Sequence, residues 1–157
     1  MGVSIRKWEL SDKTSLAQNL NNPKVLQNLR DGIPYPYTIQ DAEDFIRTML
    51  SAEKENTFSF AIALDNQAIG SIGVFRRDDR SGEIGYYIGE PYWGNGYMTD
   101  AVKQICRYVF AHSDIVRIYA EVYAHNTASC RVLEKAGFHY EGTLQNRMKI
   151  YALIKIS

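Results

Sequence analysis

The sequence has little cysteine, no net charge and no long hydrophobic run. Its two cysteines, Cys106 and Cys130, do not form a Cys-x-x-Cys pair, so we expect no metal site. The 18 Lys and Arg residues balance the 18 Asp and Glu residues, and without a basic cluster we expect no nucleic-acid partner. No apolar run approaches the roughly 20 residues that span a membrane, and the N-terminus lacks the apolar core of a signal peptide. We therefore expect a cytoplasmic protein that does not bind a membrane.

The chain is long enough for a core and alternates regularly between polar and apolar residues. Its 157 residues, 45% of them hydrophobic, favour a single domain over residues 1–157. Hydrophobic periodicity predicts strands at 3–9, 57–64, 68–76, 84–88, 115–123, 139–144 and 148–156, and helices that start near residues 12, 23, 39, 99 and 126. This order predicts an α+β fold, in which a single mixed and mostly antiparallel sheet has helices on both faces.

The most informative stretch is residues 84–102, which read as a strand, a glycine-rich loop and a helix. Pro91 ends the strand because it has no N–H to donate, and Thr99 is expected to cap the helix. Gly94 and Gly96 let the backbone approach a ligand closely, and free N–H groups at a helix start can bind an anion. The same pattern also occurs in an ordinary strand-to-helix turn, so the loop alone does not establish an anion site.

A second motif follows the next strand, where residues 126–138 read Asn-Thr-Ala-Ser-Cys-Arg-Val-Leu-Glu-Lys-Ala-Gly-Phe. Together with Tyr-Trp-Gly-Asn-Gly-Tyr-Met-Thr-Asp-Ala at 92–101, it resembles the acetyl-CoA-dependent N-acyltransferases called GNAT. More narrowly, the pair is similar to ribosomal-protein N-terminal acetyltransferases of the RimJ/RimL type. The resemblance extends loosely over nearly the whole chain. It implies the GNAT fold, in which the strand before the loop and the strand after its helix splay apart to admit the cofactor.

The resemblance also implies where acetyl-CoA, the co-substrate, would bind. Amides of the loop would hold the pyrophosphate, and backbone groups of the preceding strand would pair with the pantetheine amides. Lys103, Arg131 and Lys135 could meet the ribose 3′-phosphate, although exposed helix charges are the more ordinary interpretation. The implied cofactor-binding residues are Tyr86, Tyr87, Ile88, Trp93, Gly94, Asn95, Gly96, Tyr97, Met98, Thr99, Asn126 and Ser129.

The same resemblance calls for a group beside the leaving thiolate. Many GNAT enzymes place a tyrosine late on the last helix, but this chain has Leu133 there. Ser129 is the substitute candidate, as a hydrogen-bond donor rather than a strong acid. Asn126 would cap the helix and face the CoA arm. An ordinary helix serine and an ordinary N-cap are the competing interpretations of these two residues.

The acceptor amine must lose a proton before it can attack. At pH 7, deprotonation costs about 4.6 kcal/mol for a lysine amine and about 1.2 kcal/mol for an α-amine. A weak base, acting directly or through water, is therefore enough for an N-terminal amine. Glu83, at the start of the central strand, is the first candidate, and Glu90, Tyr86 and Tyr87 are alternatives. The competing interpretation of Glu83 is a solvated carboxylate at a strand end.

These observations favour an N-acetyltransferase that moves the acetyl group of acetyl-CoA to a primary amine, with a protein N-terminus as one acceptor. One alternative is an enzyme of the same fold that acts on a small-molecule amine such as a polyamine or an antibiotic. Another is a catalytically lapsed acyl-CoA-binding regulatory module. Tyr35 and Tyr37 are the candidate contacts to the acceptor, and the protein is expected to be a monomer or a homodimer.

Overall fold

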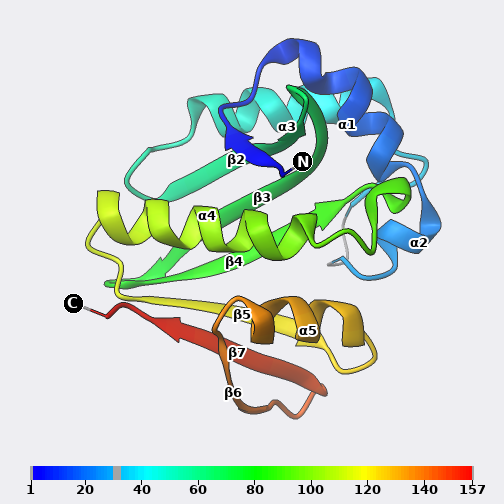
Figure 1. Ribbon diagram of the computed structural model, residues 1–157. Coiled ribbons are helices and arrows are strands. Elements are labelled where there is room, and N and C mark those ends of the chain that lie inside the picture. Colours follow the sequence, from blue (N-terminus) through cyan, green and yellow to red (C-terminus); the bar gives the residue numbers. More distant parts are fainter. Residues whose placement is uncertain (1, 30–32, 157) are drawn as a thin grey trace.

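The computed structural model describes residues 2–29 and 33–156, and these form a single seven-stranded sheet with helices (Figure 1). The strands are β1 (Ser4–Arg6), β2 (Thr57–Leu64), β3 (Gln67–Asp78), β4 (Ser81–Ile88), β5 (Arg117–Tyr123), β6 (His139–Thr143) and β7 (Met148–Ile154). Their order in the sheet is β1-β2-β3-β4-β5-β7-β6. Neighbours are antiparallel except β4 and β5, which are parallel. The predicted mixed and mostly antiparallel sheet is confirmed.

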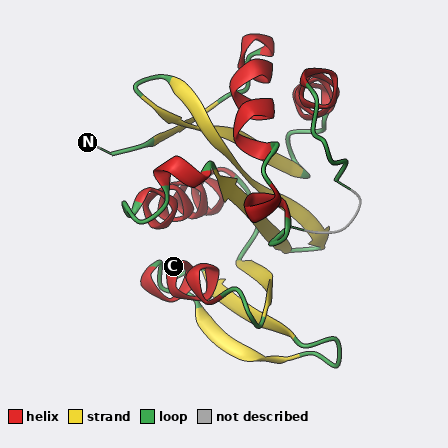
Figure 2. Cartoon of the chain, turned by 90° about the vertical axis from the view of Figure 1, so that its right-hand side faces the viewer, coloured by secondary structure: helices red, strands yellow, loops and turns green. Residues whose placement is uncertain are grey.

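The helices cover both faces of this sheet (Figure 2). They are α1 (Lys13–Leu20), α2 (Pro23–Leu26), α3 (Ile39–Ser51), α4 (Tyr97–His112) and α5 (Thr127–Lys135). On one face, α1 and α3 pack around buried residues such as Trp8 and Ile46. On the other, α4 and α5 share a second core with fully buried residues such as Ile105 and Leu133. The apolar stripe of each helix therefore faces the sheet, as its sequence period predicts.

Local capping signals set several helix boundaries. Thr38 caps α3: its hydroxyl accepts from the Asp41 N–H at 3.0 Å, and the Asp41 carboxylate accepts from the Thr38 N–H at 2.9 Å. This is the capping box that the sequence predicts. Asn22 caps α2 through the Lys24 N–H, and Pro23 is the first residue of that helix, as predicted. The sequence pattern predicts a helix from Pro23 to about Leu29, but α2 ends at Leu26.

The start of α4 differs from the prediction. Thr99 is not its N-cap, because the helix begins at Tyr97 and its N-cap is Gly96. Gly96 has a φ of 77° and makes no side-chain cap, so a left-handed glycine turns the chain into the helix where a threonine side chain was expected to do so. The first free N–H groups of α4 consequently lie two residues closer to the glycine-rich loop.

The two parallel strands at the centre of the sheet pair only at their first residues. Their register runs through Ser81 with Arg117, Gly82 with Ile118 and Glu83 with Tyr119. Beyond Glu83, β4 continues to pair with β3 as far as Ile88, and β5 continues to pair with β7 as far as Tyr123. The described parts of β4 and β5 therefore separate, which confirms the splayed strands that the family resemblance implied.

Both cysteines lie in the core of the α4 and α5 face. Cys106 is on the buried side of α4, as its position in the apolar stripe predicts, and burial raises the pKa of its thiol to about 12. Cys130 is buried on α5. In residues 2–29 and 33–156, no helix has the length and hydrophobicity that a membrane span requires.

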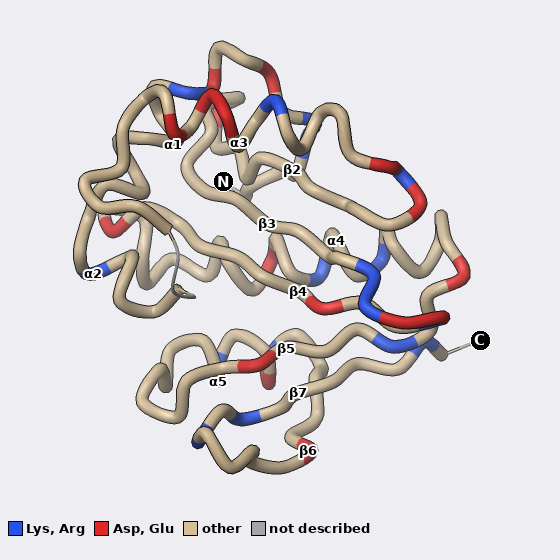
Figure 3. Tube along the Cα trace, turned by 180° about the vertical axis from the view of Figure 1, so that it is seen from behind, with Lys and Arg blue, Asp and Glu red and all other residues tan. Residues whose placement is uncertain are grey.

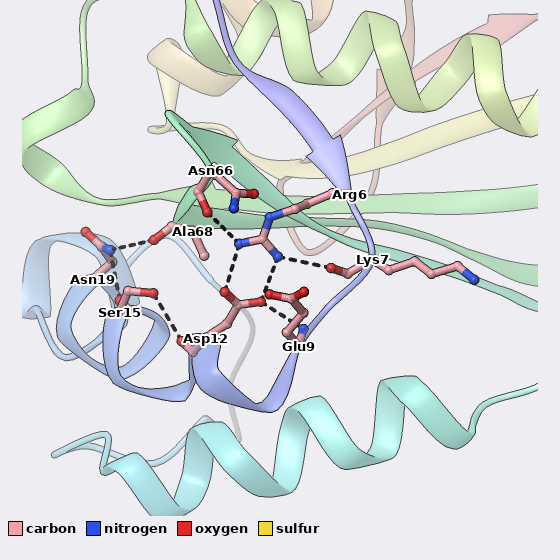
Figure 4. A network of polar contacts seen from close by, with 8 residues as sticks. All are labelled: Arg6, Lys7, Glu9, Asp12, Ser15, Asn19, Asn66 and Ala68. Carbon is pink, nitrogen blue, oxygen red and sulfur yellow. Dashed lines mark hydrogen bonds and ion pairs between the residues drawn. The ribbon is translucent and has the colours of Figure 1, made fainter.

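A largely buried ion pair between Arg6 and Asp12 lies in the N-terminal segment, which it links to the turn between β2 and β3 (Figure 4). The Arg6 guanidinium donates to both oxygens of Asp12, at 2.9 and 2.8 Å, and also to the Asn66 carbonyl in the turn between β2 and β3. The Asp12 carboxylate also accepts from the Glu9 N–H. Burial raises the pKa of Asp12, but the hydrogen bonds from Arg6 and Glu9 outweigh it and hold the pKa below its ordinary value.

Removing this pair should destabilise the fold in a pH-dependent way. We expect Asp12→Ala to lower the free energy of unfolding by about 3 kcal/mol at pH 7, since it leaves Arg6 without its buried partner. Because the folded pKa of Asp12 is lowered, the difference from wild type should persist above pH ~4 and shrink as the pH falls through the folded value. Urea unfolding from pH 3 to pH 7 measures this difference.

The exposed pair of Arg47 and Glu43 provides the control. Arg47→Ala should cost less than about 0.5 kcal/mol. Equal effects of Asp12→Ala and Arg47→Ala at pH 7 would contradict a stabilising role for the buried pair.

Candidate active site

A cavity of about 640 Å³ lies where β4 and β5 separate. Its size is typical of a small-ligand site. Its walls come from β4, the loop before α4, the first turn of α4, β5 and α5, with further residues from β3 and from α2 and the segment after it. It gathers the residues predicted to bind the cofactor together with the first candidate base. These residues are Glu83, Tyr86, Tyr87, Ile88, Trp93, Gly94, Asn95, Gly96, Tyr97, Met98, Thr99, Asn126 and Ser129.

The glycine-rich loop has two left-handed residues beside this cavity. Gly94 has a φ of 81° and Gly96 a φ of 77°, and a Cβ on either would meet no atom within 4 Å. With Gly96 as N-cap, the first N–H groups of α4 have no carbonyl partner within the helix. The positive end of the helix dipole adds to their attraction for an anion. This geometry suits a pyrophosphate approached closely by the backbone.

Two side chains hold the loop in this shape. The Trp93 Nε1–H donates to the Ile88 carbonyl at 2.9 Å, and the Asn95 side-chain amide donates to the Tyr92 carbonyl at 3.1 Å. Both bonds engage backbone carbonyls, so they leave the N–H groups of the loop available for an anion. The Ile88 carbonyl is itself occupied by Trp93, so a ligand that pairs with β4 has to use other backbone groups of that strand.

The N-terminal turn of α5 contributes hydroxyl and amide groups. Asn126 is its N-cap, and the Asn126 Oδ1 accepts from the Ser129 N–H at 3.2 Å. The Ser129 hydroxyl lies 2.6 Å from the hydroxyl of Tyr86 on β4. Burial raises the pKa of Tyr86 above its ordinary value, despite the opposing hydrogen bond with Ser129. Leu133, at the position where many GNAT enzymes have tyrosine, is fully buried in the core.

Glu83 lies at the point where β4 and β5 part. It is only 6% exposed, and its carboxylate accepts from the Arg77 Nε–H at 3.0 Å. It lines both the large cavity and a second one of about 520 Å³, whose other walls include Tyr119, Glu121 and Asn146. A buried carboxylate between two cavities can take a proton from a ligand in one as that ligand reacts with a ligand in the other.

Comparison with known proteins decides the family. Residues 3–139 match the family described as acetyltransferase (GNAT) domain. The chain belongs to the GNAT acetyltransferase family. An uncharacterized N-acetyltransferase, p20, of Bacillus licheniformis is 33% identical over 153 residues, which are 94% of this chain and 84% of that protein. The protein is accordingly an acetyl-CoA-dependent N-acyltransferase with acetyl-CoA as its co-substrate.

Two solved structures of other acetyltransferases share the fold of this GNAT chain. Mycobacterium smegmatis RimJ, in complex with CoA-disulfide, has a TM-score of 0.87 at 22% identity and covers 97% of this chain and 81% of its own. An aminoglycoside acetyltransferase in complex with coenzyme A and kanamycin has a TM-score of 0.79 at 18% identity, with coverage of 98% and 95%. At these identities the likeness shows the fold, while the acceptor of this GNAT enzyme depends on its own residues.

Several other predicted residues of the GNAT enzyme lie away from the large cavity. Glu90 is outside its walls, and hydrogen bonds from Asn22 and Lys24 lower the pKa of the Glu90 carboxyl. Tyr35 is exposed and Tyr37 is buried in the core beside α1 and α3, so neither lines a described cavity. The candidate acceptor contacts at Tyr35 and Tyr37 therefore remain predictions without a position in the site.

The remaining predicted side chains differ in their position relative to the large cavity. Arg131 and Lys135 line the large cavity from α5, whereas Lys103 is not among its lining residues. Burial raises the pKa of Tyr87 well above its ordinary value, so its phenol keeps its proton and is a poor base. Lys and Arg residues are interspersed with Asp and Glu along the trace (Figure 3), in keeping with the balanced composition.

Sequence reasoning missed Arg77 and Glu121. Arg77 is six residues before its partner Glu83 and meets it across the pairing of β3 with β4. Glu121 lies between Tyr119 and Tyr123 in β5 with the three side chains on one face, and all three line the second cavity. The period-2 alternation of that strand was the signal that could have found Glu121. Only the pairing of distant strands brings it near Glu83.

The loop geometry predicts that Gly96→Val weakens CoA binding. The new side chain would project into the space that a phosphate approaches, and valine at a φ of 77° resists the conformation that starts α4. We expect the dissociation constant for CoA, measured by isothermal titration, to rise about tenfold or more, since a loss of about 1.4 kcal/mol of amide–phosphate bonding is tenfold.

Gly137→Val is the matched control. Gly137 also has a positive φ, of 96°, but it follows α5 and does not line the cavity. Both variants should lose stability through backbone strain of about 1–2 kcal/mol, and only Gly96→Val should lose CoA affinity. Wild-type affinity in folded Gly96→Val would contradict the phosphate site.

Proposed function

We propose that this GNAT enzyme acetylates the α-amine of a protein N-terminus, as in the RimJ/RimL branch. The observation that carries the proposal is the pairing of Glu83 with Arg77 at the junction of the two cavities. Carboxylates are weak bases, since the ordinary pKa of a glutamate side chain is about 4.3. A weak base is adequate for an α-amine, which needs about 1.2 kcal/mol to become neutral at pH 7, and inadequate for lysine, which needs about 4.6 kcal/mol.

The second cavity supports an acceptor that arrives as a cation. Its walls carry the carboxylates of Glu83 and Glu121 beside the aromatic rings of Tyr119 and Tyr123. Carboxylates in a concave wall attract a protonated amine, and Glu83 then takes its proton, directly or through a water molecule. The rings offer contact area to the first side chain of a peptide.

On the CoA side, Ser129 would donate a hydrogen bond to sulfur as the carbon–sulfur bond breaks. Asn126 would hold the first turn of α5 through the Ser129 N–H and so fix the direction of that hydroxyl. Donors aimed at a developing negative charge in a site with little water contribute strongly to catalysis. The loop of residues 94–98 would bind the pyrophosphate, and the unpaired edge of β4 would bind the pantetheine amides.

A small polyamine or aminoglycoside is the second candidate acceptor. The observation that favours it is the presence of Glu83 and Glu121, with Arg77 as the single cation, among the described residues on the walls of one cavity, because this excess of negative charge suits an acceptor with more than one positive charge. Acetyl-CoA turnover over a panel that contains peptides with free α-amines, N-acetylated lysine peptides, spermidine and kanamycin separates the acceptors. Preference for spermidine or kanamycin over every α-amine would overturn the proposed acceptor. Binding of acetyl-CoA without turnover of any amine would instead indicate a regulatory module.

A pH series on Glu83→Gln tests the base and the acceptor together. The variant keeps the shape of the side chain and removes the base, so kcat/KM at pH 7 should fall about 10²–10⁴-fold. The loss should shrink as the pH passes the pKa of the acceptor, because solution then supplies the neutral amine. For an α-amine this recovery should begin near pH ~8, and for a lysine amine near pH ~10.

Glu90→Gln distinguishes the two candidate carboxylates. Glu90 is held by Asn22 and Lys24 outside the cavity, so its substitution should leave the pH profile of kcat/KM as in wild type. A wild-type rate for Glu83→Gln at pH 7 would remove Glu83 from the mechanism, and a loss confined to Glu90→Gln would assign the base to Glu90.

A further inference from the structure

A hydrogen bond between two hydroxyl groups links β4 to α5 at the wall of the large cavity. Tyr86 on β4 and Ser129 on α5 both line the cavity, and their oxygens are 2.6 Å apart. We call the gap between the separating strands β4 and β5 the wedge. The bond joins its two sides, because β4 forms one side and α5 follows β5 on the other (Figure 1). Ile84 and Ile88, which flank Tyr86 on the same strand face, are buried in the core, so the ring has little freedom to turn away.

We propose that Tyr86 is a positioning residue that orients the Ser129 hydroxyl toward the sulfur of acetyl-CoA. The proposal rests on the role of Ser129 proposed above. In it, Tyr86 donates its hydrogen bond to Ser129 Oγ, and the one proton of Ser129 is thereby directed to another acceptor. The phenol that this family often supplies from the last helix, where this chain has Leu133, is supplied here from β4 and acts through a serine.

Either hydroxyl can donate in this bond, and the proposed role of Ser129 requires Tyr86 to be the donor. A serine hydroxyl has one proton and two lone pairs, and so has a tyrosine hydroxyl. If Ser129 donated to Tyr86, the serine would have no proton left for sulfur. Burial raises the pKa of the Tyr86 hydroxyl, so the phenol keeps its proton and remains a donor. The Ser129 N–H is already bonded to Asn126, which fixes the backbone from which the hydroxyl projects.

The group transfer balances without a proton leaving Ser129 or Tyr86. The amine nitrogen forms a bond to the acetyl carbon, the carbon–sulfur bond breaks, and its electron pair remains on sulfur. An acceptor that arrives as a cation loses one proton before it attacks and a second after the nitrogen–carbon bond has formed, and the base passes both protons to solvent. The thiolate, which is stabilised by the Ser129 hydrogen bond, takes one proton from solvent and leaves as the thiol. Tyr86 therefore changes the stability of the thiolate and not the stoichiometry.

Kinetics of Tyr86→Phe, Ser129→Ala and the double variant test this coupling. With whichever amine the wild type uses best, Tyr86→Phe should lower kcat about tenfold and Ser129→Ala about 10- to 100-fold, the size of a hydrogen bond to a charged group. The KM for acetyl-CoA should stay near the wild-type value. Adding Tyr86→Phe to Ser129→Ala should cause no further loss, because the phenol acts only through the serine. A double variant that loses the product of the two single effects would overturn the proposal.

Tyr151→Phe is the control for a purely structural effect. Tyr151, on β7, also donates its hydroxyl to α5, to Glu134 at 3.2 Å, and it does not line either of the two cavities described above. If a looser α5 were the cause of the loss, Tyr151→Phe would lower kcat as much as Tyr86→Phe. We expect it to keep wild-type kcat, and thermal unfolding confirms that each variant is folded.

A measurement without any amine keeps the result independent of the proposed acceptor. The pKa of the thiol of bound CoA can be followed by its ultraviolet absorbance, with protein bound to desulfo-CoA as the blank. A hydrogen bond from an oriented Ser129 stabilises the thiolate and lowers this pKa. The pKa should be higher in both Tyr86→Phe and Ser129→Ala than in wild type and in Tyr151→Phe. An unchanged thiol pKa in Tyr86→Phe would overturn the proposal even if the proposed acceptor is correct.

Discussion

The separation of β4 from β5 after Glu83 is the constraint on which the rest of the structure depends. Each strand keeps its other neighbour, β3 for β4 and β7 for β5, so the sheet divides without losing either half. Separation leaves backbone donors and acceptors along the inner edges, and such groups need partners. An extended ligand with amide groups can supply them as an added strand would. The α4 and α5 helices, packed together over this face, keep the two halves in position.

The candidate site residues lie at increasing distances from the vertex of the wedge, the point after Glu83 where β4 and β5 part. Glu83 and its partner Arg77 lie at the vertex, where the two cavities meet. Tyr86 and Ser129 form a bridge farther along, and the left-handed glycines of the loop lie beyond, at the start of α4. Acetyl-CoA bound along the wedge, as proposed above, would have its pyrophosphate near the N–H groups of the loop at one end and its acceptor near Glu83 at the other. This order would suit catalysis by positioning of the two substrates.

Features of this enzyme that depend on neighbouring residues could be predicted from the sequence. The capping box at Thr38, the bounds of β2 and the strand–loop–helix order around Gly94 are local patterns, and the structure has all three. The prediction that Thr99 caps α4 was wrong, because the N-cap is Gly96, a residue with a positive φ and no side chain. The Tyr86–Ser129 bond and the role of Arg77 could not be read from spacing, because strand pairing and helix packing bring these residues together.

A crystal structure of the protein with CoA tests the central claim, that CoA occupies the gap between β4 and β5, most directly. The account predicts pantetheine between the two strands, pyrophosphate oxygens within hydrogen-bonding distance of N–H groups in residues 94–98, and the sulfur beside Ser129. Pantetheine bound outside the wedge, or a pyrophosphate without contacts to that loop, would contradict it.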